Sequence, residues 1–160
     1  MKKMLFLLGF PSMLVAQTLG TVVRVKDGDT VVVLLRGKTQ KTLRLAEVDC
    51  PEKGQAFGKN AKNFTASQVF GKEVTYVQTE KDRYGRIVAK IYYDQGKYLS
   101  AELIRAGLGW WYSAYSTDLS LAALQWRAKK QKLGLWQDTN ALAPWEYRKQ
   151  KRNSSIKKSD

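Results

Sequence analysis

Apolar residues recur along this chain with two different spacings, one typical of strands and one typical of helices. Several short runs are rich in Val, Leu and Thr or alternate with polar residues, as strands do. Asp-Gly, Gly-Lys and Tyr-Gly dipeptides lie between such runs and favour reversals of the chain. The pattern predicts five strands, the first three of them consecutive and antiparallel: Thr21–Val25, Thr30–Leu35, Thr42–Val48, Glu73–Gln78 and Arg86–Tyr93.

Three longer segments have apolar residues at the spacing of a helix. Two of them end at a glycine, which commonly stops a helix. Ser116 or Thr117 is the expected cap at the start of the last one. The predicted helices are Gln55–Phe70, Leu99–Ala106 and Thr117–Leu133.

The order of these elements is three strands, a helix, two strands and two further helices. This order predicts an α+β fold that is mainly β. A sheet of five short strands is expected to curl into a closed barrel, and the order suggests an OB-fold Greek-key barrel with three helices. The face of such a barrel is a common platform for nucleic acids.

Two terminal segments lie outside the predicted domain, which covers residues 20–137. Residues 1–16 begin Met-Lys-Lys and continue with a mostly apolar stretch, which matches a secretory signal peptide. The stretch is too short for a transmembrane helix of about 20 apolar residues. We expect cleavage near Ala16 and export to the periplasm or medium, with an uncleaved membrane anchor as the alternative. Residues 138–160 are basic and predict a flexible C-terminal tail, either a solvated terminus or an additional grip on nucleic acid.

The charge and composition of the chain favour some classes of function and exclude others. The chain has 28 Lys and Arg against 14 Asp and Glu, a net charge of +14, which favours a polyanionic partner. It contains no histidine, which excludes mechanisms that need an imidazole and zinc sites that need histidine ligands. The single cysteine, Cys50, excludes an intrachain disulfide and a thiolate metal site.

Acidic and basic residues gather in three short motifs, Asp27–Thr30, Arg44–Glu52 and Asp82–Arg86. Hard divalent cations such as Ca²⁺ prefer oxygen ligands, and guanidinium groups match phosphate oxygens with a fork of donors. A site that combines both is suited to cutting phosphodiester bonds. Because histidine is absent, Glu or Asp is the default group for moving or positioning a proton.

These motifs, read as Asp-Gly-Asp-Thr, Arg-Leu-x-x-Val-Asp-x-Pro-Glu and Asp-Arg-Tyr-Gly-Arg, resemble those of the thermonuclease (staphylococcal or micrococcal nuclease) family. The resemblance covers roughly residues 20–137 and includes the Leu133–Trp136 segment near the end of the domain. It implies a five-stranded OB barrel and Ca²⁺-dependent cleavage of DNA and RNA that leaves 3′-phosphate ends. It also implies a role for each matching residue.

The first group of matching residues concerns the metal and the attacking water. By resemblance, Asp29 and Asp49 would ligate Ca²⁺ with their carboxylates, and the backbone carbonyl of Cys50 would supply a third oxygen. Glu52 would contact the attacking water as a general base or as an orienting acceptor. The best-known family member has Thr where this chain has Cys50, and the thiol is a candidate for oxidation in an exported protein.

The second group concerns the phosphate. Arg44 and Arg86 would bracket the scissile phosphate and neutralise the charge that grows in the transition state. Arg44 lies in an apolar strand, so a buried anionic partner is expected for it on physical grounds as well. Arg83 and Tyr84 would touch a terminal phosphate or stack near the nucleotide.

The third group is aromatic. Tyr112 and Tyr115 fall where the family places tyrosines beside the base, and stacking on an aromatic ring accepts any base. In the same stretch, at least one of Trp110 and Trp111 is expected to complete the core. Two acidic residues have structural interpretations instead: Asp27 as a turn residue, and Glu47 as a surface residue or hydrogen-bond partner.

The sequence therefore predicts an exported Ca²⁺-dependent nuclease acting on DNA and RNA, preferably single-stranded or locally unpaired, as a monomer without a stable protein partner. A non-catalytic nucleic-acid-binding domain of the same fold is the main alternative. A cationic surface or adhesion protein would explain the charge, but not the placement of the carboxylates.

Overall fold

The computed structural model describes residues 16–156. The predicted signal peptide, residues 1–16, lies outside the described residues except for Ala16. Within residues 16–156, no helix is both long and apolar enough to cross a membrane.

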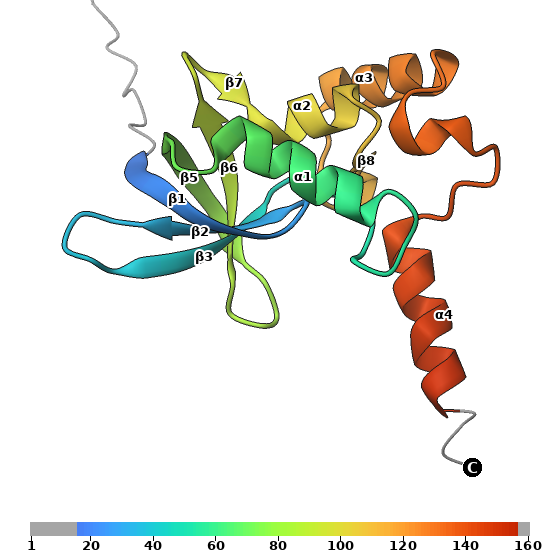
Figure 1. Cartoon of the computed structure of the whole chain (residues 1–160), viewed down its shortest axis with the longest axis horizontal. Helices are drawn as coiled ribbons and strands as arrows, with labels where there is room; N and C mark the ends of the chain where they lie inside the picture. Colours follow the sequence, from blue (N-terminus) through green and yellow to red (C-terminus); the bar gives the residue numbers. More distant parts are fainter. Residues whose placement is uncertain (1–15, 157–160) are drawn as a thin grey trace, which may run out of the picture.

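Five strands form the barrel (Figure 1). β1 pairs antiparallel with β2 and with β5, β2 pairs antiparallel with β3, and β5 pairs antiparallel with β6. A parallel pairing of β3 with β6, with Arg44 opposite Val88, closes the sheet on itself. The barrel strands are β1 (Thr18–Asp27), β2 (Thr30–Leu34), β3 (Gln40–Leu45), β5 (Glu73–Lys81) and β6 (Ile87–Tyr93). The five predicted strands and the α+β barrel are thus confirmed.

Three short strands, β4, β7 and β8, lie outside the barrel. β7 (Lys97–Tyr98) pairs with the end of β6. β4 (Val48–Asp49) pairs antiparallel with β8 (Trp110–Trp111), so that Asp49 lies opposite Trp110. The predicted strand Thr42–Val48 is therefore divided in two, with Glu47 at a positive φ of 66° between the parts.

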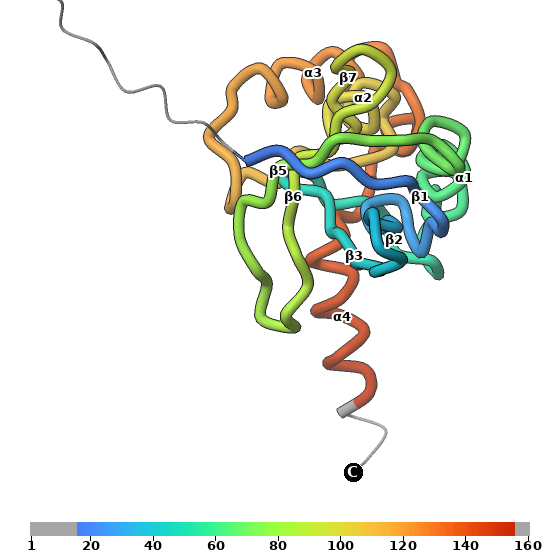
Figure 2. The backbone as a smooth tube through the Cα atoms, turned by 90° about the vertical axis from the view of Figure 1, so that its left-hand side faces the viewer, coloured from blue at the N-terminus to red at the C-terminus, as the bar shows by residue number. Residues whose placement is uncertain are grey.

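The helices cover the barrel on one side, and their apolar residues complete its core (Figures 1 and 2). They are α1 (Gly58–Val69), α2 (Leu99–Arg105) and α3 (Leu119–Lys130); the short 3-10 helices η1 (Ser113–Tyr115) and η2 (Gly134–Gln137) precede and follow α3. Leu43 and Ile91 of the barrel share this core with Leu103 of α2 and Leu121 of α3. The cap of α3 is Asp118, whose side chain accepts a hydrogen bond from the Ser120 amide, so the predicted cap at Ser116 or Thr117 is wrong. Ser116 instead accepts from the Asp118 amide.

The basic C-terminal segment differs most from expectation. Residues 144–156, expected to be part of a flexible tail, form the fourth helix of the described chain, α4 (Pro144–Ile156). Pro144 is its first residue and Glu146 lies in its first turn, both of which favour a helix start. In two views at right angles, α4 and the β5–β6 loop extend toward the same side of the barrel (Figures 1 and 2).

Candidate active site

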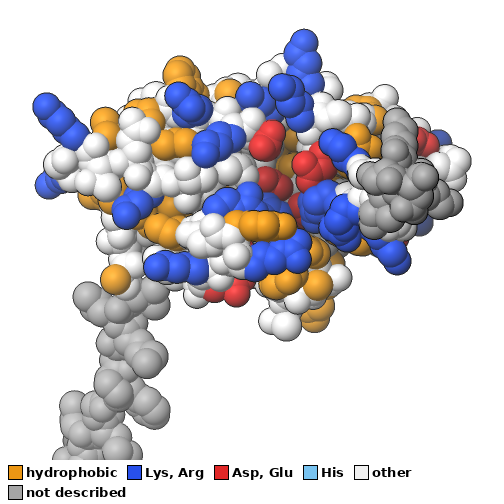
Figure 3. Space-filling model, turned by 90° about the horizontal axis from the view of Figure 1, so that it is seen from below, with side chains coloured by type: hydrophobic (Ala, Val, Ile, Leu, Met, Phe, Trp, Pro, Cys, Tyr) orange, Lys and Arg blue, Asp and Glu red, His pale blue; other side chains and the backbone are white. Residues whose placement is uncertain are grey.

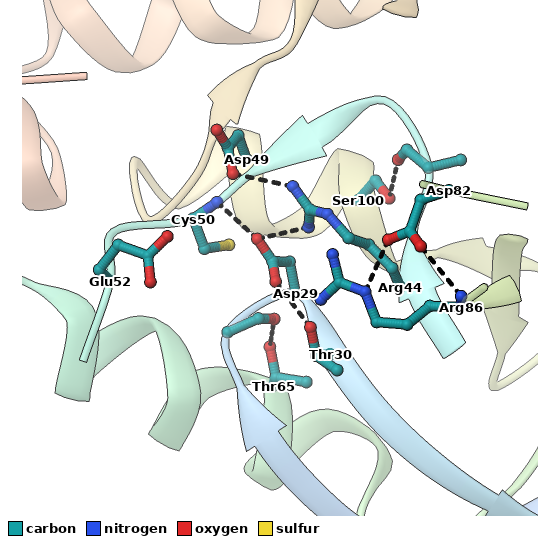
Figure 4. Close-up of polar contacts among 12 residues, drawn as sticks. Asp29, Thr30, Arg44, Asp49, Cys50, Glu52, Thr65, Asp82, Arg86 and Ser100 are labelled. Atoms are coloured by element: carbon teal, nitrogen blue, oxygen red, sulfur yellow. Dashed lines mark hydrogen bonds and ion pairs between the residues drawn. The ribbon is translucent and has the colours of Figure 1, made fainter. Parts of the chain in front are cut away.

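Asp29 lies in the tight turn between β1 and β2, and both of its carboxylate oxygens are held. One oxygen accepts from the Thr30 hydroxyl at 3.0 Å, and the other accepts from the Cys50 amide at 3.0 Å (Figure 4). The Asp29 backbone carbonyl accepts from the Leu45 amide at 2.8 Å. These contacts leave Asp29 only 8% exposed and fix its carboxylate beside the β3–β4 segment.

The turn that carries Asp29 packs closely against its neighbours at Gly28. A Cβ atom at this glycine would lie 2.7 Å from Cβ of Ala61 and 2.9 Å from Cβ of Cys50, so a larger residue does not fit without movement. The buried Thr65 hydroxyl of α1 donates to the Gly28 carbonyl at 2.5 Å. The Asp-Gly-Asp motif therefore has a packing function as well as a chemical one.

Arg44 joins the two predicted metal-ligating carboxylates. Its Nη1 lies 2.6 Å from Oδ2 of Asp29, and its Nη2 lies 2.8 Å from Oδ1 of Asp49 (Figure 4). Asp49 is fully buried. This arrangement confirms the expectation that the strand arginine has an anionic partner, and it brings Asp29, Arg44 and Asp49 into one cluster.

Burial and charge act against each other in this cluster. Burial first, and then the negative charge of Asp29, raise the pKa of Asp49, although hydrogen bonds and positive charges from two arginines oppose the shift. Burial disfavours the charged form of Arg44, but the charges of Asp29 and Asp49 raise its pKa above its ordinary value. Two carboxylates in mutual repulsion at a buried position favour a nearby cation.

Glu52 follows β4 in a loop that two contacts hold in place. The Glu52 amide donates to the side chain of Gln55 at 3.2 Å, and the side-chain nitrogen of Gln55 donates to the Leu142 carbonyl at 2.5 Å. A Cβ atom at Gly58 would lie 2.0 Å from the Glu52 carbonyl oxygen, so the start of α1 packs directly on this loop. The position of Glu52 is thus linked to the segment that precedes α4.

Arg86 lies in a turn that Asp82 organises. One carboxylate oxygen of Asp82 accepts from the amides of Tyr84 and Arg86, each at 2.9 Å, and the other accepts from Nε of Arg86 at 2.6 Å. The guanidinium groups of Arg83 and Arg86 lie 4.9 Å and 5.6 Å from the centre of the Tyr84 ring, which is 70% exposed. Since β6 pairs with β3, this turn lies near the strand that carries Arg44.

Tyr112 and Tyr115 follow β8, which pairs with β4 and so places the aromatic segment beside Asp49. Their ring centres are 4.8 Å apart, and Tyr115 is 64% exposed. Trp110 packs against Trp136 and Trp145 with ring-centre distances of 4.4 Å and 5.6 Å. The expected packing role for a tryptophan of this stretch is therefore correct for Trp110.

All of the predicted site residues line a single cleft of about 840 Å³. Figure 3, which looks onto this side, shows carboxylates in the middle and Lys and Arg side chains around them. The basic and aromatic residues could bind a polyanionic strand such as a nucleic acid, and the buried carboxylates in the middle could bind a cation. The predicted residues along the cleft are Asp29, Arg44, Asp49, Cys50, Glu52, Arg83, Tyr84, Arg86, Tyr112 and Tyr115.

The sequence did not lead us to three residues that also line the cleft, Trp145, Arg148 and Arg152 of α4. Nη2 of Arg148 lies 2.8 Å from Oδ2 of Asp49, and Nη1 lies 2.8 Å from Oε1 of Glu52. The adjacent proline and tryptophan at residues 144–145 could have indicated an ordered segment, because large apolar side chains are rare in solvated basic tails.

Two side chains beside the cluster have structural functions. Glu47 accepts from the hydroxyl groups of Tyr98 at 2.8 Å and Ser116 at 3.0 Å and forms an ion pair with Lys90, as expected for a hydrogen-bond partner. Cys50 is buried, and burial followed by the charge of Asp29 raises the pKa of its thiol well above the ordinary value. Burial therefore disfavours the oxidation expected of this thiol, because oxidation needs an accessible thiolate.

The donor set fits a hard divalent cation. Within residues 16–156, no group of three Asp, Glu or Cys side chains is clustered closely enough to hold a metal by itself. The predicted protein ligands are the carboxylates of Asp29 and Asp49, which both contact the Arg44 guanidinium, and the backbone carbonyl of Cys50. Hard oxygen donors and the repulsion between two buried carboxylates suit Ca²⁺ rather than a soft metal.

Comparison with known proteins gives the same family as the motifs. A family model described as "Staphylococcal nuclease homologue" matches residues 42–138. An Escherichia coli protein named "Uncharacterized endonuclease" is 41% identical over 147 residues, which cover 92% of this chain and 95% of that protein. "Micrococcal nuclease" of Shigella flexneri is 38% identical over 146 residues, 85% of this chain and 83% of that protein. "Staphylococcal-like nuclease CAN1" of Arabidopsis thaliana is 36% identical over 113 residues, 71% of this chain and 35% of that protein. With the barrel and cleft described above, these matches establish that the chain belongs to the family of staphylococcal nuclease homologues.

Proposed function

We propose that this chain is an exported, Ca²⁺-dependent nuclease that hydrolyses phosphodiester bonds of DNA and RNA and leaves 3′-phosphate ends. Membership in the family of staphylococcal nuclease homologues supports a hydrolase acting on nucleic acids. The observation that carries the proposal is the cluster of Asp29, Arg44 and Asp49 in the basic cleft that also contains Glu52 and Arg86.

In this proposal the carboxylates of Asp29 and Asp49 and the carbonyl of Cys50 would hold Ca²⁺, which would supply Lewis-acid catalysis to the phosphate and to the attacking water. Glu52, the most exposed carboxylate of the group, orients the attacking water or accepts its proton. The Glu52 side chain is 40% exposed and can therefore meet solvent water, whereas the Asp49 side chain is 1% exposed.

The arginines act on the phosphate. Arg44 comes from β3, and Arg86 comes from the turn that precedes β6, the strand that pairs with β3, so both guanidinium groups line one cleft. They neutralise charge on the phosphate oxygens as the transition state forms, and Arg86 also stabilises the leaving oxygen. Each has a carboxylate partner in the described residues, which keeps its guanidinium oriented before substrate binds.

Substrate binding uses the aromatic and basic rim. Tyr112 and Tyr115 stack on bases, and Arg83 and Tyr84 contact the terminal phosphate or the nucleotide beside it. Stacking requires an unpaired base, so single-stranded or locally unpaired DNA and RNA are the preferred substrates. We propose that a monomer is sufficient for this reaction, because both carboxylates and both arginines come from one chain.

The test is digestion of plasmid DNA and of RNA with Ca²⁺, with Mg²⁺ and with a chelator. We expect Ca²⁺-dependent cleavage, reduced about 10²- to 10⁴-fold by Glu52→Gln and about 10²- to 10³-fold by Arg86→Ala. Glu102→Gln and Arg105→Ala, on α2 outside the cleft, are matched controls that should cleave like the parent. Resistance of the product ends to polymerase extension until phosphatase treatment would identify 3′-phosphates.

Two results would contradict the proposal. Salt-sensitive binding without cleavage under any metal would assign the chain as a non-catalytic binding domain. Cleavage that persists undiminished in Glu52→Gln and Arg86→Ala would place the chemistry elsewhere. Export is tested separately by N-terminal sequencing of the protein recovered from periplasm and medium: a start near residue 17 supports it, and a retained Met1 in the membrane fraction supports an anchor instead.

A further inference from the structure

Helix α4 presents one face to the cleft. Trp145, Arg148 and Arg152 follow one another at intervals of three and four residues, which places them on one side of a helix, and all three line the cleft. Lys149 and Lys151 are exposed and are not among the residues that line the cleft. A basic helix with one aromatic residue on its inner face therefore forms part of the wall of the cleft that the Arg83–Arg86 turn also lines.

Trp145 extends the aromatic segment that follows β8. Its ring is stacked on Tyr112 with an interplanar angle of 4° and a ring-centre distance of 5.4 Å, and Trp110 supports it from the side at 5.6 Å. Tyr112 in turn contacts Tyr115 at 4.8 Å. Two chain segments thus combine into one row of aromatic rings along the cleft, and such rows bind successive bases without sequence preference.

Arg148 holds the helix over the carboxylates. It bridges Asp49 and Glu52 with two contacts of 2.8 Å, and the Gln55 side chain ties down the preceding segment at Leu142. Arg152 lies one turn further along, about 6 Å away along the helix axis, and is exposed. Its guanidinium has no ion-pair partner among the described residues and is accessible to phosphate.

We propose that α4 is a substrate-binding element, in which Trp145 and Tyr112 form a base-stacking subsite for an unpaired nucleotide and Arg152 binds a phosphate of the same strand. Arg148 is the positioning residue that seats the helix. The inference rests on the proposed function in so far as single-stranded nucleic acid is the ligand, and it names a substrate contact beyond the residues predicted from the motifs.

The experiment measures the affinity of the full chain for a short fluorescein-labelled oligothymidine by fluorescence anisotropy, in a chelator so that no cleavage occurs. We expect Trp145→Ala to weaken binding at least about five-fold, the lower limit for loss of one stacked base. Trp145→Phe, which keeps an aromatic ring, should retain most of the affinity. Trp126→Ala, which removes a 61% exposed tryptophan of α3, is the matched control and should bind like the parent.

The charge contact has a separate readout. Arg152→Gln should weaken binding and lower the slope of log affinity against log salt by about 0.7, the value for one phosphate contact on a single strand. Arg127→Gln on α3 is its control. A duplex of the same length should lose less affinity than the single strand in Trp145→Ala, because paired bases cannot enter a stacking subsite.

The outcomes separate this inference from the proposed function. Unchanged or tighter binding in Trp145→Ala and Arg152→Gln, with a melting temperature like the parent's, would overturn the inference and assign α4 as a cover that substrate must displace; cleavage by the parent would still stand. Weaker binding in both variants, with no cleavage by the parent under any metal, would support the subsite and refute the nuclease.

Discussion

Removal of the Arg44 guanidinium tests how the acidic cluster is held. Arg44→Ala leaves Asp49, which is fully buried, and Asp29, which is nearly so, without the cation that lies 2.6–2.8 Å from both. Breaking a buried ion pair by removing one partner costs about 3–5 kcal/mol. The lower end applies here, because Asp49 keeps Arg148 at 2.8 Å and Asp29 keeps the Thr30 and Cys50 hydrogen bonds.

A loss of about 3 kcal/mol in the free energy of unfolding corresponds to a fall of about 6–12 °C in melting temperature for a domain of this size. Circular dichroism melts at pH 7, without added divalent metal, measure it. The control is Arg105→Ala, which removes an exposed arginine paired with Glu102 and should change the free energy by no more than about 0.5 kcal/mol. An Arg44→Ala melting temperature within 2 °C of the parent would refute the view that this arginine compensates the buried carboxylates.

Three other expectations follow from local geometry. Cys50 should react with a thiol reagent about 100-fold or more slowly in the native protein than in denaturant, since burial and the charge of Asp29 raise its pKa; equal rates by absorbance would contradict this. Gly28→Ala should cost about 1–3 kcal/mol in denaturant unfolding, and adding Ala61→Gly should recover part of that loss, because the Ala61 Cβ is the nearest atom to the new methyl group. Burial opposes ionisation of Asp82, but the hydrogen bonds from Arg86 lower the pKa of this carboxyl group below its ordinary value of 3.8. The Asp82 carboxylate therefore stabilises the fold above pH 3.8, and this stabilisation is lost as the pH falls through the folded-state pKa. The melting-temperature difference between Asp82→Asn and the parent should therefore shrink below pH 3.8, and a constant difference would show that the carboxylate charge is not responsible.

Much of the barrel could be predicted because local patterns and tertiary contacts agree there. β2 is a run of β-branched residues between turn signals, and its residues are buried as such a run requires. The strand break at Glu47 could not be predicted, because a positive φ at a non-glycine residue depends on its tertiary contacts. Here Tyr98, Ser116 and Lys90 hold the Glu47 side chain.

The carboxylates and arginines could be identified from motifs because each lies in a short segment with its neighbours. Arg148 could not, because it meets Asp49 only through a contact 99 positions apart in the chain. Composition predicted a flexible basic tail for its segment, yet tertiary contacts of Trp145 and Arg148 stabilise a helix there. A charge-rich segment that includes an aromatic residue can therefore be an ordered element, whereas a purely polar one is better interpreted as a flexible tail.

The parallel pairing of Leu43 with Ile87 also determines when the cleft can form. This parallel contact joins strands that are distant in sequence, so it can form only after the whole intervening segment, including α1 and β5, has been made. Contacts between residues distant in sequence also slow folding. During synthesis, Asp29 and Asp49 leave the ribosome first, Arg86 follows later, and Arg148 is among the last residues to emerge. Stopped-flow tryptophan fluorescence should accordingly show a slow main folding phase. Because Arg86 and Arg148 belong to the second half of the chain, the N-terminal half lacks these two arginines of the cleft while it is still close to its own messenger RNA.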